Sequence, residues 1–260
     1  LSARGEIEKK LLPSMIRLGS ALENKASEFN GIVKIGRTHL QDAVPIRLGQ
    51  EFSGYASMLK HSIRRVESVG PHLAELAIGG TAVGTGLNCH PEFPSRVVAK
   101  VSDWTGLEFW EAENRFEALA GRDAAVETSG MLKTYAASLA KIANDLRWLA
   151  SGPRCGLGEI NLPPTQPGSS IMPGKVNPVI PEAVLMVTAQ VFGNDVTINV
   201  AGQSGNLELN TMMPVIAYNL LNSIQMLASG TSVLADRCVN GISANESHLE
   251  DLIERSLALV

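Results

Sequence analysis

The sequence predicts an all-α fold built as a bundle of long helices, and three observations support this. Apolar residues recur at alternating three- and four-residue steps over residues 132–149, the spacing that lines one face of a helix. Helical spacing recurs in several other long segments of the 260-residue chain. No segment alternates convincingly between apolar and polar residues, as a half-buried strand would.

The periodic segments are taken here in chain order. They predict helices over residues 3–29, 48–76, 93–104, 115–150, 183–201, 209–234 and 246–259. Pro13 is a candidate site for a kink in the first helix, and a bend is expected near Gly70 and Pro71 in the second. Residues 32–45 are expected to be an extended and turn-like link. The helix over residues 115–150 should be continuous and should pack along its apolar seam.

A glycine-rich stretch covers residues 78–88. It is not a dinucleotide-binding fingerprint, because no strand precedes it and no βαβ unit surrounds it. We attribute its glycines to a close backbone approach between packed helices.

Composition argues against several classes of function. A net charge of −4 and a pI near 5.8 argue against a nucleic-acid partner, and no run of about 18 uninterrupted apolar residues predicts a membrane span. The cysteines Cys89, Cys155 and Cys238 lie far apart and are interpreted as free thiols in a reducing compartment, the cytoplasm. The five histidines lack metal-ligand spacing, so we expect no metal and no cofactor.

The loop over residues 166–182 is the strongest candidate for a binding site. Its glycines and prolines prevent regular structure, and Pro178 and Pro181 suit the first turn of a following helix, with Asn177 or a neighbour as its N-cap. Lys175 is the only charged side chain between Glu159 and Glu182.

Two adjacent serines, Ser169 and Ser170, complete the polar set of this loop. Hydroxyl groups, an unopposed cation and a helix N-terminus facing one space form a suitable receptor for a small carboxylate. The alternative is a structural turn with exposed polar residues, which is the more common outcome for glycine- and proline-rich loops.

The loop sequence Gly168-Ser-Ser-Ile-Met-Pro-Gly-Lys-Val-Asn-Pro178 resembles the signature of the fumarase/aspartase superfamily. The stretches 36–45 (Gly-Arg-Thr-His-Leu-Gln-Asp-Ala-Val-Pro) and 79–88 (Gly-Gly-Thr-Ala-Val-Gly-Thr-Gly-Leu-Asn) agree with it, in family order. The Thr38-His39 pair and the Pro-Gly-Lys of the loop are most similar to the class II fumarase branch.

This resemblance implies an architecture. The chain would be the central helical domain, residues 1–260, truncated at both ends, with the active-site loop at residues 166–182. Proteins of this superfamily form homotetramers with a central twenty-helix bundle, and each active site is shared between three subunits. We expect the same of the intact protein, and we expect that the fragment alone is inactive.

The resemblance also implies roles for individual residues. Ser169 is the candidate base, and His39 paired with Glu182 would handle the water or the leaving hydroxyl. Substrate contacts are carried over to Thr38, Ser170, Lys175, Val176 and Asn177.

The expected activity is that of a lyase, the reversible hydration of fumarate to L-malate, with a small dicarboxylate as substrate. The alternatives are aspartate ammonia-lyase or another lyase of this superfamily that releases fumarate, and a catalytically inactive helical scaffold of the same fold. No nucleic-acid or membrane partner is expected. The expected location is the cytoplasm, or the mitochondrial matrix in a eukaryote.

Overall fold

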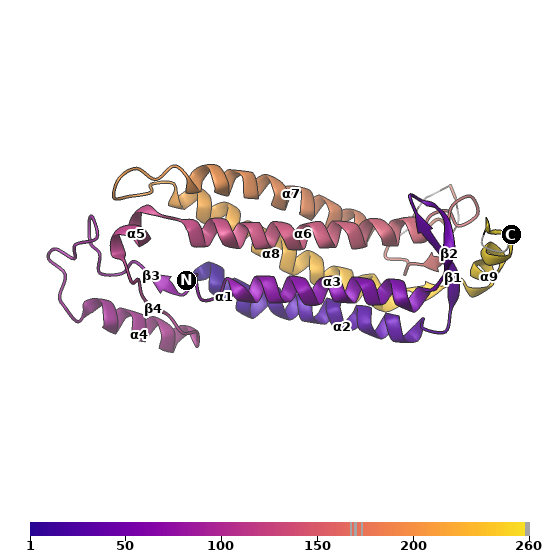
Figure 1. The fold of residues 1–260 in the computed structure, drawn as a ribbon, viewed down its shortest axis with the longest axis horizontal. Helices are drawn as coiled ribbons and strands as arrows, with labels where there is room; N and C mark the ends of the chain where they lie inside the picture. The colour runs from indigo at the N-terminus through magenta and orange to yellow at the C-terminus, as the bar shows by residue number, and fades with distance from the viewer. Residues whose placement is uncertain (167, 169–170, 173, 258–260) are drawn as a thin grey trace. The chain divides into compact units, whose positions relative to one another are not determined.

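The computed structural model describes residues 1–166, 168, 171–172 and 174–257, and helices dominate this part of the chain (Figure 1). The α-helices are α1 (Ser2–Glu6), α2 (Leu12–Glu28), α3 (Leu48–Ser68), α4 (Phe93–Thr105), α5 (Arg115–Ala120), α6 (Asp123–Leu149), α7 (Val179–Gly202), α8 (Met213–Arg237) and α9 (Glu246–Arg255). A π-helix, η1 (Ile7–Leu11), and a 3₁₀-helix, η2 (Val239–Gly241), complete the helical set. The predicted all-α class is confirmed.

The described residues also contain short strands in three two-stranded sheets. The pairs are β1 (Val33–Thr38) with β2 (Gln41–Arg47), antiparallel; β3 (Glu75–Leu76) with β4 (Trp110–Glu111), parallel; and β5 (Ile160–Asn161) with β6 (Ser243–Ala244), antiparallel. Residues 32–45 were expected to form an extended and turn-like link, and the structure corrects this by pairing them as the two strands of a hairpin, β1–β2. Three consecutive residues of β1 are buried, so the strand lacks the alternation that would have revealed it.

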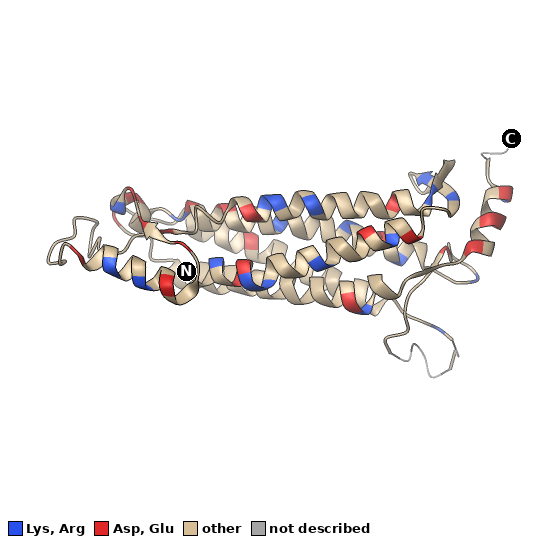
Figure 2. Cartoon of the chain, turned by 90° about the horizontal axis from the view of Figure 1, so that it is seen from below, with Lys and Arg blue, Asp and Glu red and all other residues tan. Residues whose placement is uncertain are grey.

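The chain divides into two compact units. The first contains Leu1–Pro13, Ser62–Ala136 and Ala189–Ala228, and the second contains Ser14–His61, Ala137–Thr188 and Ser229–Val260. Helices α2, α3, α6, α7 and α8 contribute residues to both units, because the boundaries fall within them. Long stretches of the helices carry no charged residue, whereas α9 carries mainly acidic ones (Figure 2).

In the first unit, buried polar groups join α7 to its neighbours. Asp195 accepts hydrogen bonds from Ser129 Oγ (2.7 Å) and Lys133 Nζ (2.6 Å) of α6, and Asn194 Nδ2 donates to Ser223 Oγ (2.9 Å) of α8. Buried polar groups need such partners.

Helix α7 is also the one helix of the described chain whose length and composition would let it cross a membrane, and about a third of its apolar window is buried here. Packed core helices pass the same test. The buried carboxylate of Asp195, paired with α6, is typical of a helix that packs against protein.

The predicted seam of α6 is confirmed. Its residues are buried, with exposed fractions of 0–4%, at Leu132, Tyr135, Leu139, Ile142, Leu146 and Leu149. The prediction of one continuous helix over residues 115–150 is wrong, because α5 ends at Ala120 and α6 begins at Asp123. Gly121 is extended (φ −80°, ψ 159°), and the Arg122 guanidinium donates to the carbonyls of Ala118, Leu119 and Gly121. These bonds satisfy the free carbonyl groups at the end of α5.

Two prolines shape the first helices. The π-helix η1 ends at Leu11, two residues before Pro13, and a proline removes a backbone donor from the helical ladder, so the irregularity occurs near the predicted kink. Helix α3 ends at Ser68 instead of bending and continuing to residue 76. Pro71 has no N–H group to extend the helix, and residues 69–74 form turns.

The glycines of residues 78–88 do allow close packing, though against side chains of the following helices rather than between helix backbones. A Cβ on Gly79 (φ 83°) would lie 2.3 Å from Pro94 Cγ, and a Cβ on Gly84 (φ 104°) would lie 2.7 Å from Phe116 Cδ1. Both positions therefore require glycine for backbone conformation and for space.

In the second unit, the hairpin β1–β2 connects α2 to α3. The Leu48 N–H donates to the Ile32 carbonyl (2.8 Å) and closes the base of the hairpin. Helix α9 packs against β1, and both lie at one end of this unit together with β5 and β6 (Figure 1). The candidate site residues that the structure describes belong to this unit.

Candidate active site

Thr38 and His39 lie at the tip of the hairpin. Thr38 pairs with Gln41, and His39 and Leu40 form a two-residue loop in which both have positive φ, 56° and 61°. Such two-residue hairpin turns normally contain Asn or Gly, because the left-handed conformation costs other residues about 1–2 kcal/mol each. Both Thr38 and His39 are exposed. The turn therefore presents a hydroxyl and an imidazole to solvent on a strained backbone.

The described part of the 166–182 loop is closed by its own backbone. Asn177 Nδ2 donates to the Gly168 carbonyl at 3.3 Å, and a Cβ on Gly168 would lie only 1.6 Å from the Lys175 carbonyl oxygen. Lys175 and Val176 are exposed, and none of the ion pairs among the described residues involves Lys175. The backbone of the loop thus comes together at Gly168, and the Lys175 side chain is exposed to solvent.

The predicted base and its neighbour, Ser169 and Ser170, lie outside the described residues. Helix α7 begins at Val179, directly after Pro178, which agrees with prolines at the helix start but places that start four residues before the expected residue 183. The Glu182 N–H donates to the Pro178 carbonyl at 3.0 Å and forms the first helical turn. Free N–H groups at such a helix start attract anions.

Glu182 has a partner that sequence reasoning missed. Its Oε1 lies 3.8 Å from Nη2 of Arg147 on α6, and both side chains are partly exposed (40% and 38%). Arg147 Nη1 also donates to Asn144 Oδ1 at 3.0 Å. Among the described residues, no ion pair or hydrogen bond joins His39 to Glu182, so their pairing stays a prediction.

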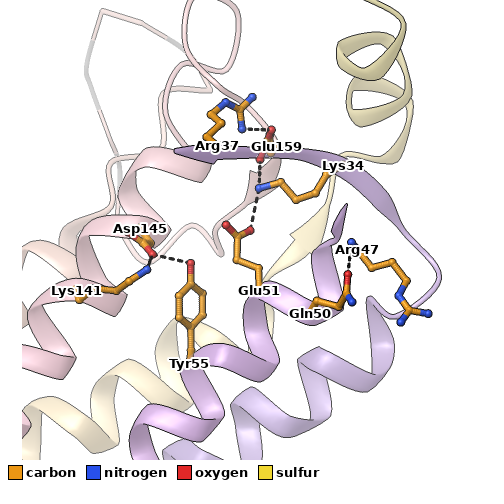
Figure 3. A network of polar contacts seen from close by, with 9 residues as sticks. All are labelled: Lys34, Arg37, Arg47, Gln50, Glu51, Tyr55, Lys141, Asp145 and Glu159. Atoms are coloured by element: carbon orange, nitrogen blue, oxygen red, sulfur yellow. Dashed lines mark hydrogen bonds and ion pairs between the residues drawn. The ribbon is translucent and has the colours of Figure 1, made fainter. Parts of the chain in front are cut away.

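A network of ionic side chains lies under the hairpin (Figure 3). The fully buried Glu159 accepts a hydrogen bond from Arg37 Nη1 at Oε1 (2.6 Å), and Lys34 Nζ lies 2.7 Å from its Oε2 as an ion pair without an aligned hydrogen bond. Lys34 Nζ also donates to Glu51 Oε2 of α3 at 2.8 Å. The sequence analysis did not find this network. A lysine inside the apolar run of residues 32–35 was the available signal.

A second polar cluster lies nearby in Figure 3, and among the described residues no hydrogen bond or ion pair joins it to the hairpin. Tyr55 Oη donates to Asp145 Oδ2 at 2.8 Å, and Lys141 Nζ binds the same carboxylate. Burial, and then the nearby carboxylates, raise the pKa of Tyr55 far above its ordinary value. Tyr55 therefore stays a neutral hydrogen-bond donor.

A small cavity lies beneath the end of the loop, lined in part by Asn177, Pro178, Arg237 and Cys238. The described structure contains three free thiols, and Cys238 is the buried one. Burial raises the pKa of Cys238 to about 12. Among the described residues, no three His, Cys, Asp or Glu side chains gather in a group able to hold a metal ion.

Comparisons with known proteins agree with one another. A family model described as lyase matches residues 1–193. The chain is 58% identical over 260 residues to the class II fumarate hydratase of Neisseria meningitidis, covering 100% of this chain and 56% of that protein. It is 54% identical over 260 residues to mitochondrial fumarate hydratase 1 of Arabidopsis thaliana, of which it covers 53%.

Comparison with solved structures gives the same result. The crystal structure of class II fumarase from Schistosoma mansoni superposes with a TM-score of 0.97 at 43% identity, covering 100% of this chain and 57% of that one. The chain thus spans little more than half the length of the relatives that it matches. Because the lyase model covers most of the sequence and these relatives align with all of it, the chain belongs to the lyase family that this model describes.

Proposed function

We propose that the intact protein catalyses the reversible hydration of fumarate to L-malate. The observation that carries this proposal is the 58% identity to a class II fumarate hydratase over all 260 residues. The exposed Thr38-His39 turn and the unopposed cation of Lys175 beside a helix start support it, because a dicarboxylate needs hydroxyl, amide and cationic donors.

In the dehydration direction, a base must remove a weakly acidic proton from the carbon next to a carboxylate of malate. We assign this role to Ser169, whose hydroxyl would need activation by the N–H groups of the loop and the start of α7. The carbanion formed is held as a dianionic carboxylate. Lys175, Val176 and Asn177 would bind the substrate carboxylates, with Thr38 and Ser170 as further donors.

The hydroxyl group must then leave with a proton. We assign this step to His39, with Glu182 orienting the imidazole and favouring its protonated form. In our proposal Arg147 helps to orient the Glu182 carboxylate, because its guanidinium lies 3.8 Å away. In this scheme the serine and the histidine act on different bonds of the substrate.

Further proposals concern assembly and location. The outer faces of α7 and α8 expose apolar residues, among them Met186 (72%), Val196 (63%) and Tyr218 (72%). Exposed apolar residues of this kind are typical of an interface. We infer a homotetramer in which three subunits contribute to each active site, located in the cytoplasm or in the mitochondrial matrix of a eukaryote.

The test uses the intact protein with fumarate, L-malate and L-aspartate as separate substrates. Release of fumarate from malate but not from aspartate is expected. Release only from aspartate would favour an ammonia-lyase instead, and no turnover of either would favour an inactive scaffold.

Two variants test the assigned roles. Ser169→Ala should lower kcat by about 10²–10⁴-fold, and should equally slow exchange of the C3 proton of malate. His39→Asn should lower net dehydration while retaining more of this exchange, because the leaving hydroxyl is a separate step. Near-normal exchange in Ser169→Ala, with exchange abolished in His39→Asn, would reverse the two assignments.

A further inference from the structure

Glu159 contacts the strand that ends in the Thr38-His39 turn, although it carries no role in the proposed reaction. Its side chain is fully buried, and its Oε1 accepts a hydrogen bond from Arg37, the residue directly before Thr38. We propose that Glu159 is a positioning residue that holds the Thr38-His39 turn in its reactive place through Arg37 and Lys34. This inference rests on the proposed function, in which the turn contacts the substrate.

The backbone of Glu159 is fixed on both sides. Its N–H donates to the carbonyl of Leu149, the last residue of α6, at 2.8 Å. Its carbonyl accepts from the N–H of Asn245, which precedes α9, at 2.9 Å. Asn245 Nδ2 also donates to the Gly158 carbonyl at 3.0 Å. The carboxylate therefore extends from a backbone segment that two separate helix ends hold in place.

Lys34 and Arg37 both reach this carboxylate although they lie three apart in β1, and residues three apart in a regular strand point to opposite faces. The pairing is irregular between them. Ile35 faces Pro45 and Arg37 faces Asp42, so two residues of β2, Ala43 and Val44, lie opposite Gly36 alone. A Cβ on Gly36 would lie 2.9 Å from the Val44 carbonyl oxygen, so the bulge favours glycine there. Figure 3 shows both side chains directed at Glu159.

The charges in the network balance. Lys34, with a side chain only 2% exposed, and Arg37 are matched by Glu51 and Glu159. Removing one partner of a buried ion pair leaves an uncompensated charge, which costs more free energy than the pair contributes. If Glu159 became neutral, the cations of β1 would have to move toward solvent or toward Glu51, and the end of the strand would move with them.

The strained backbone at the tip of the hairpin explains why the strand needs to be anchored. His39 and Leu40 both hold positive φ values without being glycine. Strained backbone of this kind persists where the surrounding structure holds it. The exposed turn gains no support from burial of its own side chains, so the ion pairs of Arg37 and Lys34 hold one of its two arms. A displacement of about 1 Å at a catalytic group can lower turnover about 10²-fold.

The experiment compares Glu159→Gln with Tyr55→Phe in the intact protein. The control removes a partly buried hydrogen bond in the same unit, and among the described residues no hydrogen bond or ion pair joins Tyr55 or Asp145 to β1 or β2. We expect Glu159→Gln to lower kcat for malate dehydration by at least about tenfold and to speed hydrogen–deuterium exchange of residues 33–47. Tyr55→Phe should leave both close to wild type, even where it lowers the unfolding midpoint.

A double variant tests whether charge compensation is the cause. Lys34→Met combined with Glu159→Gln removes one charge of each sign, so the net charge of the network stays zero with Arg37 and Glu51 remaining. The double variant should recover kcat and slow exchange of residues 33–47 by several-fold relative to Glu159→Gln alone. It also provides a folded comparison where the single variant fails to fold.

Wild-type kcat and exchange in Glu159→Gln would overturn the positioning role, as would equal local exchange in Glu159→Gln and Tyr55→Phe. Failure of the double variant to recover would equally overturn charge compensation. Wild-type protein that does not act on malate or fumarate would overturn the proposed function instead. The exchange of residues 33–47 would still test the anchoring by Glu159, because that measurement does not depend on turnover.

Discussion

The hairpin over residues 33–47 and the loop over residues 166–178 are both proposed to carry substrate-binding groups, yet they are held in different ways. The hairpin rests on buried charges, since Lys34 and Arg37 bind the fully buried Glu159. In its described part, the loop is held by backbone contacts, with the Gly168 carbonyl accepting from Asn177. A buried ion pair is disrupted when either partner is removed, whereas a tight backbone turn is disrupted when a side chain is added to its glycine.

Because of this difference, we expect substitutions in the two regions to have different effects on stability and on activity. Neutralising a charge under the hairpin should destabilise the folded protein and disturb its turn together. Changing a residue of the loop should impair activity while the helices stay intact, because the loop buries little surface. The predictions below test this separation, from the largest expected change in free energy to the smallest.

The largest effect is expected from Lys34→Met. This change removes the partner of both Glu51 and Glu159, and breaking a buried ion pair in this way costs about 3–5 kcal/mol. The measurement is the midpoint of urea unfolding at a fixed protein concentration. The matched variant is Lys175→Met in the exposed loop, which should change stability by no more than about 0.5 kcal/mol. Equal losses in the two variants would contradict the comparison.

Gly168→Ala tests the loop. The added Cβ would overlap the Lys175 carbonyl at 1.6 Å, so the chain must open where its two ends meet. We expect kcat/KM for malate to fall by more than about tenfold, a loss of about 1.4 kcal/mol in transition-state stabilisation. The urea midpoint should stay near that of wild type.

Gly31→Ala is the matched control, because an added Cβ at Gly31 meets no atom within 4 Å. This variant should retain normal turnover. A Gly168→Ala protein with normal turnover would show that the closure of the loop does not position Lys175 and Asn177.

The helices could be predicted from the sequence because a single physical rule, the periodic burial of apolar residues, places them. The rule failed where a polar side chain acts on the backbone. The break between α5 and α6 depends on Arg122, whose guanidinium binds three carbonyl groups, and the apolar period gives no sign of it. The hairpin was missed because three consecutive residues of β1 are buried and β2 carries an extra residue opposite Gly36, so neither strand shows the alternation that identifies a strand.

The candidate site was predictable only in part. The resemblance of the loop and of residues 36–45 supplied the identities of Thr38, His39 and Lys175. It gave no indication of Glu159 or Arg147, because their contacts join residues that are far apart in the sequence. Such contacts depend on how helix ends and strands meet, which neither composition nor local spacing specifies.

The smallest effect concerns Cys238, which reports on opening of the loop. Its thiol lines the cavity beneath Asn177 and Pro178, and burial raises its pKa to about 12. The thiolate is the reactive form, so at pH 8 only about 10⁻⁴ of Cys238 is reactive, against about a quarter of an ordinary exposed thiol. The exposed Cys155 should therefore react with a thiol reagent at least about 10³-fold faster.

The same pKa predicts a pH dependence with a definite sign. The folded state keeps the Cys238 proton after the unfolded state has lost it, so the free energy of unfolding should fall as the pH rises from about 9 towards 12. At pH 10 the loss relative to pH 7 should be about 2 kcal/mol, with an unfolded thiol pKa of about 8.5. Cys238→Ala should lack this pH-dependent part of the loss. An identical alkaline decline in this variant would show that other groups cause it.

Site-resolved labelling of Cys238 then separates the two regions. Gly168→Ala should speed labelling of Cys238, because opening the loop uncovers the cavity under its end. Glu159→Gln should leave this rate near that of wild type, because the ion network acts on the hairpin and contacts no residue that lines the cavity. Labelling in urea-unfolded protein, where all thiols are accessible, provides the reference rate. Faster labelling of Cys238 in Glu159→Gln than in Gly168→Ala would mean that the hairpin and the loop move together. The ion network under the hairpin and the backbone closure of the loop would then not act independently.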